Sequence, residues 1–182
     1  TTEFDYFTAV DDNAPEDNAG AGMIGTVEFV SSTLYRYATV NIDKLTENLG
    51  DRTAAAQAVE AFIRAFSLSM PTGKQNTFAN RTRPDFILAE VRTDQPVSLV
   101  NAFEKPIAND GTALASAAVE LARYAVDGDR DFGTKPATSL YLVNGRASSP
   151  ELLSSLDGRS TAAAFPDLIS AIGDSIRTDA EQ

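Results

Sequence analysis

Residues 20–25, GAGMIG, match the G-x-G-x-x-G pattern in which glycines let the backbone approach the pyrophosphate of a dinucleotide. That chemistry needs a strand before the first glycine and a helix that starts at the motif, because the helix N-terminus holds the phosphates. Here an acidic, irregular segment precedes the glycines, and TVEFV, a strand pattern, follows them. The sequence therefore argues against a dinucleotide site. It predicts a hairpin-like tip whose glycines adopt positive φ, with Met23 and Ile24 as an apolar pair beside it.

Carboxylates occur at two places with spacings that could hold a hard metal ion. One is a loop cluster formed by Asp11, Asp12, Glu16 and Asp17. The other, DGDRD at 127–131, has the alternating acids of a calcium-binding loop, but Phe132 and Thr138 replace the glycine and glutamate that such loops need. Solvated surface is the simpler interpretation of both clusters, and the sequence predicts no metal or other cofactor.

A third group is a basic, turn-rich loop at 71–84. It contains Lys74, Gln75, Asn76, Asn80, Arg81 and Arg83. These side chains are suited to phosphate contacts, and they run against the acidic trend of the chain. A solvated loop remains the alternative interpretation.

Composition limits what this chain can do. It has 182 residues, 43% hydrophobic and 23% charged, which is typical of a globular protein. No apolar run is long enough to span a membrane. There is no Cys and no His, which excludes disulfides, thiolate sites and His-dependent catalytic triads within this chain, so we predict no enzyme. The absence of Cys is consistent with a cytoplasmic location. The net charge of −11 argues against a nucleic-acid partner.

The pattern of apolar residues predicts an α+β protein, with helices packed on a small antiparallel sheet. Asp43 is expected to cap the first short helix and Gly50 to end it, Asp51 or Thr53 to cap the second, and Pro71 to follow it. The expected elements are a strand at 4–10, a loop at 11–25, one or two strands at 26–42, helices at 44–49 and 52–70, a strand at 86–91, a strand or irregular run at 97–103, a helix at 112–126, a strand at 139–143 and a helix at 165–176.

Four ordered blocks carry a resemblance to a known family: FDYFTAVDD, GTVEFVSSTLYRYATVNIDKLTENLG, MPTGKQNTFA and VSLVNAFEKPI. The chain resembles the CasC family, the backbone subunit of the type I-E CRISPR Cascade complex. The resemblance is strongest from Phe4 to Ile107. Members of the family are longer, and this chain, which begins with Thr rather than Met, is similar to their C-terminal half.

The resemblance implies a non-catalytic CRISPR RNA-binding scaffold in an antiviral ribonucleoprotein complex of the cytoplasm. Copies of such a subunit line up along the guide as a filament, contact neighbouring copies and other Cascade subunits, and leave the bases free to pair with target DNA. The implied fold is an RRM-like (ferredoxin-like) palm with a β-hairpin thumb. Residues 1–30 would be the thumb extension, and residues 31–182 the C-terminal part of the palm.

The resemblance also implies RNA-binding residues. Tyr6, Phe7 and Thr8 match the thumb segment that lies against RNA, and Met23 and Ile24 match its apolar tip, where a wedge could unstack a base step. Much of the basic surface would come from the N-terminal half, so these 182 residues alone should bind a guide weakly.

The basic loop would add Lys74, Gln75, Asn76 and Arg81 to the RNA-binding set. Two alternatives remain. One is an acidic protein-interaction module without nucleic acid. The other is a metal-dependent hydrolase that uses Asp11, Asp12 and Asp17.

Overall fold

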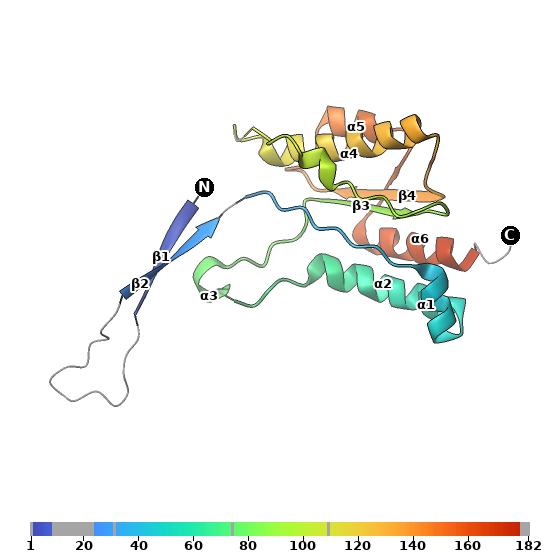
Figure 1. The fold of residues 1–182 in the computed structure, drawn as a ribbon, viewed down its shortest axis with the longest axis horizontal. Helices are drawn as coiled ribbons and strands as arrows, with labels where there is room; N and C mark the ends of the chain where they lie inside the picture. The colour runs from blue at the N-terminus through green and yellow to red at the C-terminus, as the bar shows by residue number, and fades with distance from the viewer. Residues whose placement is uncertain (1, 9–23, 31, 74, 109, 179–182) are drawn as a thin grey trace. The chain divides into compact units, whose positions relative to one another are not determined.

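The computed structural model describes residues 2–8, 24–30, 32–73, 75–108 and 110–178 (Figure 1). Contacts divide the chain into two units, Thr1–Leu34 and Tyr35–Gln182, called here the hairpin unit and the main unit. Within the described part of the chain, no helix combines the length and the apolar character needed to cross a bilayer.

The hairpin unit contains two antiparallel strands, β1 (Thr2–Thr8) and β2 (Ile24–Val30). The predicted strand at 4–10 is confirmed through Thr8, beyond which residues 9–23 lie outside the described part. Gly25 lies inside β2 and shows no positive φ, so the prediction for this glycine is wrong. A Cβ atom on Gly25 would lie 2.3 Å from Cζ of Phe7, so the glycine makes room for a ring.

The described residues of the main unit form three strands and several helices, so the predicted α+β class is confirmed. The strand order is β3-β4-β5; β3 and β4 are antiparallel, whereas β5 is parallel to β4. The RRM-like assignment stays a prediction. The elements are α1 (Ile42–Leu49), α2 (Arg52–Leu68), α3 (Gln75–Phe78), β3 (Phe86–Val91), the 3-10 helix η1 (Val100–Phe103), α4 (Ala113–Phe132), β4 (Thr138–Val143), α5 (Pro150–Leu156), β5 (Thr161–Ala162) and α6 (Phe165–Thr178).

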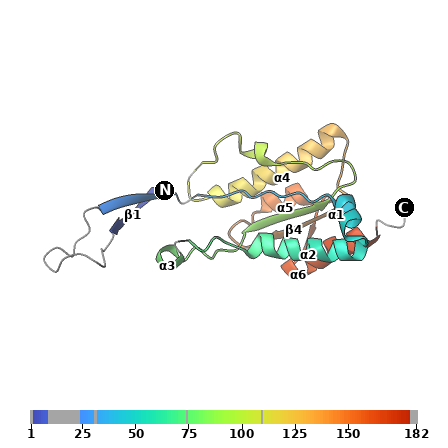
Figure 2. The ribbon, with the colours of Figure 1, turned by 60° about the horizontal axis from the view of Figure 1, so that its bottom comes forward.

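Helices cover both faces of the sheet. Figures 1 and 2 show α4 and α5 on one side of β3 and β4, and α2 and α6 on the other. Side chains alternate accordingly: Tyr141 packs with α4 and α5, whereas Leu140 packs with α2 and α6. Double coverage explains why β3 is apolar except at Glu90, and why the last four residues of β4, 140–143, are apolar.

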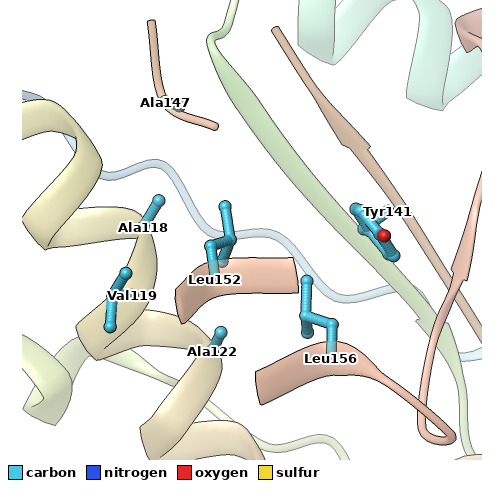
Figure 3. Packing of buried hydrophobic residues seen from close by; sticks show 7 residues of the cluster. All are labelled: Ala118, Val119, Ala122, Tyr141, Ala147, Leu152 and Leu156. Atoms are coloured by element: carbon cyan, nitrogen blue, oxygen red, sulfur yellow. The ribbon is translucent and has the colours of Figure 1, made fainter. Parts of the chain in front are cut away.

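The apolar cluster between the sheet and the helices α4 and α5 excludes solvent from two leucine side chains. Leu152 and Leu156 of α5 are fully buried against α4 and Tyr141 (Figure 3). The sequence analysis did not predict α5. Ser149 begins this helix, since its hydroxyl accepts a hydrogen bond from the Leu152 amide, and Pro150 occupies the first turn.

Capping residues fix the start of α1 and α2. The cap of α1 is Asn41, whose side-chain oxygen accepts a hydrogen bond from the Lys44 amide, so the predicted cap at Asp43 is wrong. Asp43 lies instead in the first turn. Gly50 ends α1 with φ of 71°, and Asp51 caps α2, as predicted.

Residues 32–41 form no strand, contrary to the prediction. Their alternation has another cause: Tyr35 packs with Phe103 in one apolar cluster, and Val40 packs in the α2–α6 cluster. The side chains of this segment therefore pack into two different apolar clusters, although its backbone does not pair with a neighbouring strand. Two further predictions are wrong in detail, because residues 100–103 are 3-10 helix and the loop at 71–84 contains α3.

A ring of four charges links β3, α4 and the turn after α5. Arg92 pairs with Asp129 at 2.9 Å and with Glu90 at 3.5 Å, and Arg159 pairs with Glu90 at 2.7 Å and with Asp129 at 2.6 Å. All four side chains are largely buried. We call Glu90, Arg92, Asp129 and Arg159 the charge ring; each charge in it has opposite charges on both sides.

Candidate nucleic-acid interface

One face of the hairpin carries exposed apolar side chains. Residues directly opposite one another in an antiparallel pair share a face, and Tyr6 pairs with Thr26 while position 8 pairs with Ile24. Tyr6 is 72% exposed and Ile24 is 77% exposed. A two-stranded hairpin has no second layer of its own to cover such groups. This face can therefore offer an aromatic ring and an aliphatic side chain to a partner.

The predicted thumb residues do not all share that face. Phe7 pairs with Gly25, and its ring lies over that glycine on the opposite side of the hairpin. The structure thus brings together Tyr6, position 8 and Ile24, and separates Phe7 from them. Met23 and the side chain of Thr8 lie outside the described part of the chain. Contact of these residues with RNA stays a prediction.

The basic loop is more ordered than its sequence indicates. Gln75 and Asn76 lie in α3, and the side-chain Nε2 of Gln75 donates a hydrogen bond to the carbonyl of Pro71. Arg81 Nε donates to Gln75 Oε1 at 2.5 Å, which ties the end of the loop to α3. Asn76 and Arg81 are exposed. Lys74 lies outside the described residues.

Ala79, between α3 and Arg81, has φ of 48°. This left-handed conformation is unfavourable for a residue with a Cβ atom and often marks a functional segment. The amide of Arg81 donates to the carbonyl of Ala79 at 2.9 Å, which closes a tight turn. The turn fixes the backbone from which Arg81 projects.

Arg36, which the sequence analysis did not select, joins the same region. Its guanidinium lies over the ring of Phe66, 4.4 Å from the centroid, and donates to the carbonyl of Ser69 at 3.3 Å. Ser69 ends α2, and the segment that follows leads into the basic loop. We call Arg36 together with residues 61–84 the arginine region.

A simple signal could have found this region from sequence. Acidic residues make up 26 of 182, one in seven, yet residues 61–84 contain none. Residues 29–42, around Arg36, also contain none. The contacts of Arg36 bring these two acid-free segments together. The net charge of −11 hides this local excess of positive charge.

The arginine region differs from the part of the main unit after residue 90 in how its arginines are paired. Every arginine after residue 90 pairs with a carboxylate: Arg92, Arg123, Arg130, Arg146, Arg159 and Arg177. Arg36, Arg64, Arg81 and Arg83 form no salt bridge within the described residues. An unpaired guanidinium keeps most of its five donors for an external anion such as phosphate.

The acids at 127–131 do not form the metal site that their spacing suggested. DGDRD at 127–131 lies within α4 rather than in a calcium-binding loop. Asp127 and Asp131 pair with Arg130, and Asp129 belongs to the charge ring. Across the described part of the chain, no three carboxylates gather as a metal site would require. The loop cluster at Asp11, Asp12, Glu16 and Asp17 lies outside the described residues.

Comparison with known proteins places the chain in a family. The family model described as CT1975-like protein, a Cas family, matches residues 1–171, and the chain belongs to this family. No curated protein matches the chain.

Two similar chains come from solved structures of CRISPR assemblies. One, in a CRISPR RNA-guided surveillance complex, is 36% identical, with a TM-score of 0.77, over 96% of this chain and 65% of that one. Another, in a CRISPR RNA-guided surveillance complex, pre-nicking, is 34% identical, with a TM-score of 0.79, over 97% of this chain and 46% of that one. The present chain thus spans about two thirds of the first and less than half of the second.

Proposed function

We propose that this chain is an RNA-binding part of a scaffold subunit in a CRISPR RNA-guided surveillance complex, of the CasC kind found in type I-E Cascade. The observation that carries the proposal is the 36% identity, over 96% of this chain, to a chain of such a complex. The four sequence blocks that resemble CasC support the finer assignment, including correspondence to its C-terminal half.

The two candidate surfaces would perform different tasks. The arginine region would neutralise phosphates of the guide, because its guanidinium groups have no internal carboxylate partner. Tyr6 would stack on a base, and Ile24 with Met23 would act as an apolar wedge at the hairpin tip. This division suits a scaffold that holds the backbone and leaves most base edges free for target DNA.

The proposed subunit is non-catalytic and works in several copies along the guide, beside other Cascade subunits. With neither His nor Cys, the chain contains no His-dependent triad and no thiol nucleophile. A cavity of about 450 Å³ in the main unit is lined in part by Asp129 and Arg159, which already neutralise each other. It therefore offers no unpaired acid–base couple for a reaction.

Salt dependence of RNA binding tests the proposal. Replacing Arg81 and Arg83 with Gln should weaken binding of single-stranded RNA. It should also make the negative slope of log K against log salt shallower by about 1.4, or about 0.7 for each lost phosphate contact. The matched control replaces Arg123 and Arg130, which already have carboxylate partners. It should leave the slope unchanged.

Affinity measured by fluorescence anisotropy over a series of salt concentrations gives both slopes. Equal slopes for the wild type and both double variants would contradict the phosphate-binding role of the arginine region. If the longer parent protein also copurifies without nucleic acid, the acidic protein-interaction module becomes the better account.

A further inference from the structure

Two aromatic rings stack on each other outside the hydrophobic core. Phe62 and Phe66, one helical turn apart on α2, have ring centroids 5.5 Å apart and an interplanar angle of 21°. Neither ring belongs to the three apolar clusters that the described residues of the main unit form. Phe62 is 39% exposed, although α2 buries Val59 on its inner face. Helix packing within this unit therefore does not account for the pair.

The third member of this group is Arg36, which precedes Phe66 by thirty residues in the sequence and yet contacts its ring. Its guanidinium covers the ring of Phe66 and donates one hydrogen bond to the carbonyl of Ser69. Arginine has five N–H donors, so the group keeps donors for an outside acceptor. The cation–π contact holds the guanidinium beside the ring pair.

Charge indicates the kind of partner that fits this surface. An apolar protein partner could use Phe62 together with the exposed Leu68 at the end of α2. However, such a partner would have to cover Arg36 and the other unpaired arginines, which favours a polyanion instead. A ligand that combines flat apolar faces with regularly spaced negative charge is single-stranded nucleic acid.

We propose that Phe62, Phe66 and Arg36 form a stacking site for one unpaired base of the RNA, separate from the hairpin. The base stacks on the exposed ring of Phe62, and Arg36 contacts the adjoining phosphate. The inference rests on the proposed RNA-binding function and adds a base contact to the phosphate contacts of the arginine region. It predicts that residues on α2 contribute affinity that salt does not remove.

The absence of tryptophan from the chain gives a direct test. In Phe62→Trp, the only indole would lie at the proposed site, and titration of the full chain with oligouridine at low ionic strength should quench its fluorescence. Phe132→Trp is the matched control, since Phe132 is 84% exposed at the end of α4 beside Asp131. It should not be quenched. Polyphosphate, which has no bases, should quench neither.

A second variant keeps the proposal separate from the general RNA-binding function. Phe62→Ala should bind oligouridine about tenfold more weakly, with an unchanged salt slope and an unchanged melting curve. If Arg81 and Arg83 prove necessary while Phe62→Trp is not quenched and Phe62→Ala binds normally, the stacking site is refuted and the proposed function stands. If Phe62→Ala instead abolishes self-association of the chain, the surface is a protein interface and the inference is also refuted. If no arginine variant changes RNA binding, the proposed function itself fails.

Discussion

The arginine region and the charge ring use the same residue type for opposite purposes. In the charge ring, Arg92 and Arg159 are largely buried between carboxylates, where each charge is balanced inside the protein. In the arginine region, Arg81 and Arg83 are exposed and have no carboxylate partner within the described residues. The first arrangement stabilises a fold, whereas the second leaves positive charge for a ligand. In an acidic protein, the pairing of arginines is thus more informative than net charge.

The largest expected effect comes from breaking the charge ring. Arg159→Ala should lower the free energy of unfolding by about 3 kcal/mol, because it leaves Glu90 and Asp129 without one of their buried partners. RNA affinity of the folded variant should not change. Arg130→Ala is the control, since its exposed ion pairs should contribute less than about 1 kcal/mol.

Chemical denaturation and RNA titration of both variants measure these effects. If Arg159→Ala weakened RNA binding without lowering stability, the charge ring would be a ligand site. The contrast between the two groups of arginines would then be wrong.

A carboxylate introduced into the arginine region should have a smaller effect, and on binding rather than on stability. Thr82→Glu places a negative charge between Arg81 and Arg83 and should weaken RNA binding about tenfold, by repelling phosphate and by pairing with a neighbouring guanidinium. Its effect on unfolding should stay within about 0.5 kcal/mol, as for most surface substitutions.

Ser148→Glu is the matched control, because Ser148 is exposed near Arg146, which already pairs with Asp85. Equal RNA affinity for Thr82→Glu and the wild type would show that the lack of acidic residues at 61–84 does not contribute to RNA binding. The two titrations need the same RNA and the same salt concentration.

The smallest expected effect is a pH dependence at the edge of the charge ring. Hydrogen bonds from the Arg92 guanidinium lower the pKa of Asp94 from 3.8 to about 2. A folded-state pKa below the unfolded value means that this carboxylate stabilises the protein above about pH 4, and that the stabilisation is lost as the pH falls through about 2. Asp94→Asn should therefore be less stable than the wild type at pH 7, and the difference should shrink progressively between about pH 4 and pH 2. A stability difference at pH 2 as large as that at pH 7 would contradict this assignment.

Parts of the fold were predictable because local sequence and tertiary burial agree. The strand at Phe86–Val91 was predicted to the residue, since coverage on both faces makes it apolar at every position except Glu90. The helix α4 was predicted too short, because DGDRD resembles a loop until the ion pairs of its acids are known. The short helix α5 has only seven residues, too few for a periodic pattern to be distinctive.

The candidate site was predictable only in part for a similar reason. Gln75, Asn76 and Arg81 stand out as a basic loop in the sequence. Arg36 does not, because its role depends on contact with Phe66 thirty residues later. Phe62 resembles any apolar residue of an amphipathic helix, and only the structure shows that its ring lies outside the core. Arg36 and Phe62 were both missed because their roles depend on tertiary contacts and burial that the sequence does not show.

The most direct test of the central claim is ultraviolet crosslinking of the guide RNA within the assembled complex, followed by mass spectrometry of the crosslinked peptides. RNA binding through the hairpin and the arginine region predicts crosslinks at 2–30, with Tyr6 prominent, and at 61–84. Few crosslinks are expected in peptides from α4, whose two arginines both pair with carboxylates, and from α5, which contains no arginine. Crosslinks confined to α4 and α5, or absent from the whole chain, would contradict the account.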